Sequence, residues 1–185
     1  MTSLDSLAEL FRQADAFVIS NHDFKTQGLV MSAVIPAKNL VSLGRSLCAG
    51  GYSLLDISTL EASEGFLLTY HFDNINQPGR LAVRLLAPTG KPVVPSLCDV
   101  FQGAEWHERE SRDFYGVVFD GNPNPLPLLL AEDFDGSPPL RKNPKDLAPL
   151  SALGLFGQPQ SVDPAWEAYV NPPAKESSPK AEKQA

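Results

Sequence analysis

Residues 52–72 read YSLLDISTLEASEGFLLTYHF and contain two runs typical of β-strands, Tyr52 to Leu60 and Phe66 to Phe72. Leu, Ile, Thr and aromatic residues dominate both runs, and such residues favour extended backbone. The connecting residues 61–65 are short, polar and end in a glycine, as hairpin loops often do. This stretch therefore predicts a β-hairpin at the centre of the fold.

A further strand follows the hairpin, because residues 80–86 place Leu81, Val83 and Leu85 on one face. The connection, residues 74–79, is rich in Asn, Pro and Gly, which are typical turn formers. The sequence thus predicts three consecutive strands, a meander of the kind found in antiparallel sheets.

The predicted order before the hairpin is helix, strand, strand, helix. Apolar residues recur at helical spacing over residues 4–14, and short strands are expected at residues 17–19 and 29–35. Pro36 ends the second of these strands and suits the start of a helix. That helix ends at Gly50-Gly51. Its expected buried stripe consists of Leu40, Val41, Leu43, Leu47 and Cys48.

The character of the chain changes after Lys91. Pro92 and Pro95 are expected to end the sheet, and a charged helix is expected from Ala104 to Tyr115. Beyond Gly121 the chain is dense in proline yet keeps several leucines, which predicts an extended, irregular segment. An apolar segment of this kind has to lie across its own domain or across a partner.

The predicted fold class is α+β: a mostly antiparallel sheet with helices packed on it, followed by an extended proline-rich C-terminal segment. We divide the chain into an α+β domain (residues 1–95), a helix with an extended docking segment (96–150), and a partly disordered tail (151–185), in which residues 171–185 have a disordered composition.

Composition excludes several functions. The net charge of −7 disfavours nucleic acid and anionic lipid as ligands. Two cysteines, Cys48 and Cys98, are too few for a four-thiolate cluster, and we expect both to be buried and inert. Residues 1–10 lack the basic start of a signal peptide, and no apolar run reaches the length of a membrane span. We therefore expect a cytoplasmic protein that meets the membrane only through partners.

The expected helix reads AEWHERESRDFY from Ala104 and combines acids with arginines. Three interpretations are open: a solvated helix with lateral ion pairs, an acid/base pair, or an ion-pair clasp that fixes the helix to the next segment or to a partner. On helical geometry, one face would carry two carboxylates among apolar side chains. That face comprises Trp106, Glu110, Asp113, Phe114 and Val117.

The run Trp106-His107-Glu108-Arg109-Glu110-x-x-Asp113-Phe114-Tyr115-Gly116 closely resembles the E-R-E-x-x-D signature of the C-type subunit of NADH-quinone oxidoreductase, the 30 kDa subunit family of respiratory complex I. Further matches follow in family order. They are Pro95-Ser96, Phe119-Asp120-Gly121, the acidic-aromatic turn Glu132-Asp133-Phe134-Asp135-Gly136, and Pro139-Leu140-Arg141-Lys142. The resemblance covers roughly residues 30–144.

The resemblance implies a structural subunit of the peripheral arm, without a catalytic site, metal or cofactor of its own. Flavin, iron–sulfur clusters and quinone would belong to partner subunits. The implied partners are the large hydrogenase-like (D-type) subunit, near the quinone site, and other peripheral-arm subunits, attached to the cytoplasmic face of the membrane. The implied interface residues are Glu108, Arg109, Glu110, Asp113, Phe114, Tyr115, Gly116, Pro139, Leu140, Arg141 and Lys142.

Within this interface, Glu108, Arg109, Glu110 and Asp113 are expected to pair with Arg141, Lys142 or a partner. The chain departs from the family at residues 121–123, where G-N-P replaces G-H-P, and at residues 125–127, where P-L-P replaces a basic stretch. These departures leave an alternative open: an equivalent subunit of a related membrane-bound complex, such as a nickel–iron hydrogenase or a dehydrogenase with another electron donor.

The remaining aromatic and histidine residues carry less information. His22, His71 and His107 lack the mutual spacing of a metal site. Trp166 and Tyr169 follow Pro164 and indicate a short helix, which either packs its aromatic pair on this chain or anchors a partner.

Overall fold

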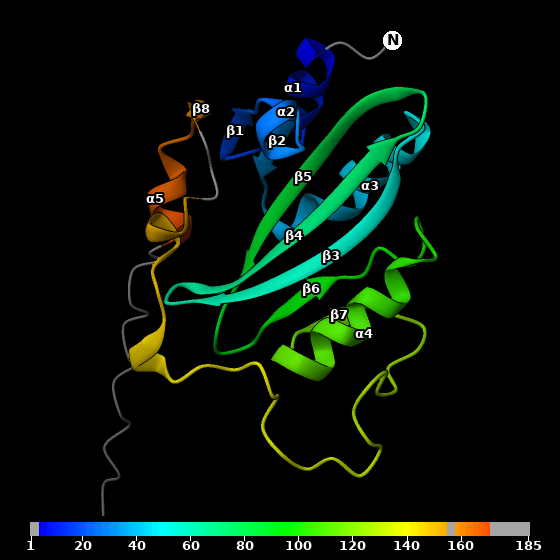
Figure 1. Cartoon of the computed structure of the whole chain (residues 1–185), viewed down its shortest axis with the longest axis vertical. Helices are drawn as coiled ribbons and strands as arrows, with labels where there is room; N and C mark the ends of the chain where they lie inside the picture. The colour runs from blue at the N-terminus through cyan, green and yellow to red at the C-terminus, as the bar shows by residue number, and fades with distance from the viewer. Residues whose placement is uncertain (1–3, 155–157, 171–185) are drawn as a thin grey trace, which may run out of the picture.

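A computed structural model describes residues 4–154 and 158–170. Its main element is a six-stranded sheet in the order β3-β4-β5-β2-β1-β8 (Figure 1). The β2–β5 pair is parallel and the other four neighbouring pairs are antiparallel, which confirms the predicted α+β class. The strands are β1 (Val18–Asn21), β2 (Met31–Val34), β3 (Ser53–Ala62), β4 (Gly65–Asn74), β5 (Gln77–Ala87) and β8 (Gln158–Val162).

The central hairpin forms as predicted, but its strands are longer than the sequence indicated. β3 and β4 pair as far as Ala62 opposite Gly65, so only Ser63 and Glu64 form the turn. Gly65 adopts φ +152°, and a Cβ there would lie 2.3 Å from the carbonyl oxygen of Ala87. Glycine at this position therefore allows the third strand to approach closely.

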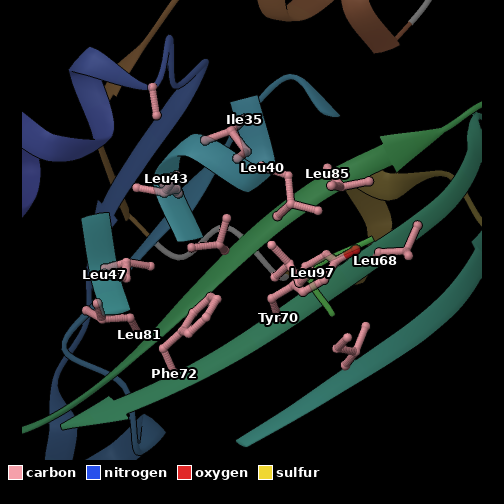
Figure 2. Close-up of a cluster of buried hydrophobic side chains, with 14 of the residues drawn as sticks. Ile35, Leu40, Leu43, Leu47, Leu68, Tyr70, Phe72, Leu81, Leu85 and Leu97 are labelled. Carbon is pink, nitrogen blue, oxygen red and sulfur yellow. The ribbon is translucent and has the colours of Figure 1, made fainter. Parts of the chain in front are cut away.

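Helices α1 (Leu4–Gln13) and α3 (Leu40–Ala49) cover one face of the sheet and close the main core (Figures 1 and 2). α3 follows a 3₁₀ turn, η1 (Ala37–Asn39), and a short helix, α2 (Phe24–Gln27), connects β1 to β2. The core side chains shown in Figure 2 come from helix, sheet and the segment after it: Ile35, Leu40, Leu43, Leu47, Leu68, Tyr70, Phe72, Leu81, Leu85 and Leu97.

The predicted buried stripe of α3 needs correction at two positions. Leu40, Leu43 and Leu47 are buried, but Cys48 is exposed and Val41 only partly buried. The buried stripe follows i, i+3 and i+7 from Leu40, which rotates Cys48 out to solvent.

The segment after the sheet adds a small second sheet that the sequence did not reveal. β6 (Val93–Pro95) and β7 (Val118–Asp120) pair in parallel and are joined through α4 (Ala104–Tyr115). Pro92 and Pro95 therefore do not end all strand structure. Proline is tolerated here because the strand is short and pairs with a single partner.

The described coil beyond β7 contains two 3₁₀ turns, η2 (Pro144–Asp146) and η3 (Leu150–Leu153), and is otherwise irregular, as predicted. β8 and α5 (Ala165–Val170) then return to the sheet. Leu150 and Val170 pack on the second face, against side chains of β3, β4 and β5. The predicted disorder of residues 171–185 lies outside the described residues.

Of the two interpretations left open for the aromatic pair of α5, the structure shows the one in which the pair packs on this chain. The Tyr169 ring lies 4.4 Å from the Phe17 ring, centroid to centroid, and its hydroxyl donates to the carbonyl of Leu86 at 3.0 Å. The Trp166 ring lies nearby, 6.2 Å from that of Phe17. These contacts attach the end of the described chain to the N-terminal part of the sheet.

Candidate interface region around helix α4

Helix α4 lies over the β3 side of the sheet and ends at Gly116, whose φ of +77° is a left-handed conformation that glycine favours. Its buried side chains are Ala104, Glu108, Ser111 and Asp113. This differs from the predicted apolar face, because Glu110 is exposed and Trp106 is 65% exposed. The side chains that face the core instead follow the i, i+4, i+7 spacing from Ala104, namely Ala104, Glu108 and Ser111.

Glu108 is a fully buried carboxylate that no lysine or arginine neutralises among the described residues. It accepts hydrogen bonds from Ser96 Oγ at 2.7 Å, the Leu97 amide at 2.7 Å and Asn122 Nδ2 at 2.8 Å, and the Cys98 thiol lies 3.3 Å away. Several donors to one carboxylate offset part of the cost of removing it from water.

The Glu108 cluster links three separate segments: α4, the residues that follow β6, and the residues that follow β7. Asn122, which lies in the G-N-P stretch of residues 121–123, supplies one of these donors. Burial raises the pKa of Cys98 to about 11, and the neighbouring Glu108 adds to this effect. Cys98 is therefore a thiol at neutral pH, and the structure leaves it partly rather than fully buried.

Arg109 attaches the following coil to α4. Its Nε and a terminal nitrogen donate to the carbonyl oxygens of Leu126 at 2.9 Å and Pro127 at 2.7 Å. The other terminal nitrogen pairs with Glu105 at 3.2 Å, one helical turn earlier on α4. Asn124 Nδ2 also donates to Glu105, at 2.9 Å. The guanidinium thus fixes the backbone of the P-L-P stretch.

Asp113 holds the next three residues. Its Oδ2 accepts the backbone N–H groups of Leu128, Leu129 and Leu130 at 2.8, 2.8 and 3.1 Å. Burial opposes ionisation, but these three hydrogen bonds and the charge of Arg112 outweigh it and lower the pKa of Asp113. Asp113 is therefore ionised at neutral pH and acts as an anchor for the coil.

Arg141 and Lys142 anchor the far end of the coil, but their partner is on the sheet rather than on α4. Arg141 Nε donates to Glu61 at 2.8 Å, and the Lys142 amide donates to the other oxygen of the same carboxylate at 2.8 Å. The Arg141 guanidinium also lies over the Phe66 ring, 4.8 Å from its centroid. The pairing that we expected between Arg141 and the acids of α4 is replaced by this one.

Glu61 was missed by sequence reasoning because it fell in the expected hairpin loop. Its partner lies 80 residues further along the chain, and no local pattern indicates such a pairing.

The remaining predicted interface residues at the end of α4 and in the P-L-R-K motif contact one another or the sheet. The Leu140 amide donates to the Phe114 carbonyl at 3.0 Å, and Pro138 packs beside Gly116. Pro139 joins these two contacts along the chain, and Tyr115 packs edge-on to Phe66.

The coil is held mainly through its main chain. Arg109, Asp113 and Glu61 all bind backbone atoms of the coil. Three coil side chains, those of Asn122, Asn124 and Arg141, add hydrogen bonds to this backbone attachment. Four large apolar side chains of the coil consequently remain in solvent, with exposed fractions of 44–64%. They are Leu126, Leu129, Phe134 and Leu140.

The described residues contain neither a metal-binding cluster nor a membrane span. No group of three or more His, Cys, Asp or Glu side chains in this part of the chain is arranged to hold a metal ion. No described helix is long and apolar enough to cross a membrane.

Residues 33–146 match the family model of the respiratory-chain NADH dehydrogenase 30 kDa subunit, and this range contains both signature motifs and all their anchors. The chain belongs to this family. Relatives of this 30 kDa-type chain include the C 1 subunit of the NADH-quinone oxidoreductase of Rhizobium meliloti, 32% identical over 148 residues, which are 76% of this chain and 72% of that protein.

The J subunit of the NAD(P)H-quinone oxidoreductase of Parasynechococcus marenigrum is 52% identical over 58 residues. That match spans 31% of this chain and only 30% of the relative. Both relatives are named as single subunits of a quinone oxidoreductase.

Solved structures share the fold of this 30 kDa-type subunit. A trypsin-resistant fragment of Nqo5 (residues 1–134) is 25% identical, with a TM-score of 0.56 over 65% of this chain and 98% of the fragment. A chain of the membrane-bound sulfane sulfur reductase, an archaeal respiratory membrane complex, has a TM-score of 0.63 at 23% identity, over 81% of this chain and 88% of that one.

Proposed function

We propose that this 30 kDa-type chain is a non-catalytic, cofactor-free subunit of the peripheral arm of a complex I-type NADH:quinone oxidoreductase. Its role is to dock onto the large hydrogenase-like subunit, near the quinone site, at the cytoplasmic face of the membrane. Flavin, iron–sulfur clusters and quinone belong to the partner subunits. The chain supports electron transfer by holding those partners in position.

One observation carries this proposal: the coil is tied down by its backbone and presents its leucines outward. Burying a large apolar side chain contributes about 1.5–3 kcal/mol, so leaving Leu126, Leu129, Phe134 and Leu140 in water forgoes a substantial stabilisation. A chain that uses a buried carboxylate and an arginine to keep this arrangement is built to offer those side chains to another protein.

The acid/base interpretation of α4 loses support from the same geometry. Glu110, one acid of the face considered above, lies on the exposed side of α4. Glu108 and Asp113 are buried and accept hydrogen bonds that hold separate segments of the chain together. A general base has to come within hydrogen-bond reach of a substrate proton, which burial of these two side chains disfavours. These two carboxylates are therefore structural anchors in our proposal.

The test is a charge placed on the coil surface. Leu129→Glu leaves the anchoring hydrogen bonds intact, because the backbone amide of residue 129 is retained. We expect the isolated variant to unfold at the same urea concentration as the parent chain, and the variant introduced into the host to lose assembly of the membrane complex. Blue-native gels and NADH:quinone activity of membranes measure that loss.

The matched control is Leu4→Glu, because Leu4 is 49% exposed at the start of α1, away from the coil (Figure 1). This control should assemble normally. Normal assembly of Leu129→Glu, with full activity, would refute the proposal.

A second candidate is the equivalent subunit of a related membrane-bound complex with another electron donor. The observation that favours it is the recurrence of this fold in a sulfane sulfur reductase, a respiratory complex of a different kind. Membranes that contain the assembled complex distinguish the two candidates by the donor they oxidise, NADH or another reductant.

A further inference from the structure

A groove runs along the outer edge of β3, between this strand and α4. Four consecutive residues of the strand, 56–59, line it, together with Glu110, Ser111 and Phe114 of the helix. Side chains of a strand alternate between its two faces, so four consecutive lining residues place the groove along the backbone edge itself. Its volume is about 300 Å³.

The strand edge in this groove has no partner strand. β3 is the terminal strand of the sheet and pairs only with β4 among the described residues. Within the described part of the chain, no loop or turn forms a backbone hydrogen bond with residues 56–59. Half of the N–H and C=O groups of such a strand point outward, and an added strand can pair with them.

The groove is lined by acidic and by apolar side chains. Asp56, whose side chain is half exposed, and the exposed Glu110 contribute two carboxylates, and the described lining residues include no lysine or arginine. His107 faces Asp56, with Nδ1 at 3.3 Å from the carboxylate. Leu140, one of the exposed apolar side chains of the coil, also lines the groove, beside Phe114.

We propose that this groove receives an extended, basic segment of a partner subunit, which adds to β3 as a further strand. The backbone edge supplies the main-chain hydrogen bonds, as in other cases of β-strand addition. Asp56 and Glu110 select lysine or arginine on the incoming segment, because like charges would be repelled there. The inference rests on the proposed subunit role, and it adds a second, polar contact beside the apolar coil.

Other occupants fit the groove less well. A second copy of this chain would bring an edge with the same two carboxylates, and the net charge of −7 disfavours such self-association. A free small molecule would leave outward N–H and C=O groups of this strand edge unmatched. An extended basic polypeptide satisfies the edge and the charges together.

The experiment places a photoreactive residue in the assembled complex. Ser58→p-benzoylphenylalanine probes the groove, Leu129→p-benzoylphenylalanine probes the coil, and Asp120→p-benzoylphenylalanine probes an exposed position on β7. Cross-linked peptides are then sequenced. We expect the Ser58 probe to capture an extended segment rich in lysine or arginine from another subunit. The outward-pointing amides among residues 56–59, which do not pair with β4, should exchange at least about tenfold more slowly in the complex than in the isolated chain.

A charge reversal tests the selectivity. Glu110→Lys should reduce the yield at Ser58 about tenfold and leave the Leu129 cross-link unchanged. The matched control Asp120→Lys changes the net charge equally and should affect neither cross-link.

Each contrary result has one meaning. A complex that cross-links at Leu129 but not at Ser58 overturns the groove and leaves the docking coil intact. Capture of a second copy of this chain, or of an acidic or helical segment, also overturns the groove. Failure at Leu129 with capture at Ser58 overturns the coil proposal instead, and failure at both positions overturns both.

Discussion

Arg141 Nε lies 2.8 Å from the Glu61 carboxylate, although 80 residues separate them, and Glu61 is almost completely buried. This pair closes the coil onto the end of β3. Arg141→Ala leaves the carboxylate with only the Lys142 amide, so we expect a loss of about 1–3 kcal/mol in the free energy of unfolding. Because the arginine is more than one-third exposed, the loss should stay below that of a fully buried pair.

Chemical denaturation measures the global effect of Arg141→Ala, and trypsin cleavage near Lys142 measures the local one. Lys145→Ala, which removes an exposed charge nearby, serves as the control. Equal protease resistance of Arg141→Ala and the parent chain would show that the pair does not hold the coil.

Arg109 gives a sharper test of how the coil is attached. Arg109→Ala removes both hydrogen bonds to the Leu126 and Pro127 carbonyls, and the guanidinium otherwise pairs with Glu105 of its own helix. We expect the complex to fail to assemble while amide exchange in β1–β5 stays at parent levels. Arg109→Lys should rescue only partly, because an ammonium cannot reproduce the planar fork. Full assembly of Arg109→Ala would contradict this role.

Asp113 predicts how the coil responds to acid. Its pKa is lower in the folded chain than the ordinary 3.8, so its stabilisation is complete above that value and is lost as pH falls through the lower folded pKa. Exchange of the amides of Leu128 to Leu130 should therefore stay slow down to about pH 4 and accelerate below it, after correction for the intrinsic pH dependence. NMR measures these amides one by one.

In Asp113→Asn, the same three amides should be less protected at neutral pH and should lose this pH dependence, because the amide oxygen accepts without a charge. Identical profiles for Asp113→Asn and the parent chain would assign the acid response to another carboxylate.

Glu108 should be the most sensitive position of α4. Glu108→Ala leaves a buried amide, a hydroxyl and a side-chain amide without their acceptor and creates a cavity, so we expect a loss of about 3–5 kcal/mol in unfolding free energy. Glu110→Ala, two residues away on the exposed side, should change it by less than about 0.5 kcal/mol. Urea denaturation of both variants gives the comparison, and similar midpoints would remove Glu108 from its structural role.

Local patterns along the chain were sufficient to predict most elements and the family. Alternating and helical spacing placed the hairpin, α1, α3 and α4 close to their observed bounds, because the burial of one face imposes a local period. The signature run and the P-L-R-K motif identified the family that the match over residues 33–146 shows. The proline-rich composition also predicted an irregular coil with apolar side chains.

Which residues meet was settled only when the segments packed in three dimensions. Packing turned Glu110 outward and Glu108 inward, and it paired Arg141 with Glu61 rather than with the acids of α4. The face of α4 that turns inward and the contacts across 80 positions both depend on how separate segments fit together. Local sequence patterns do not predict these contacts, because the partner of a side chain depends on the tertiary structure and not on the neighbouring residues along the chain.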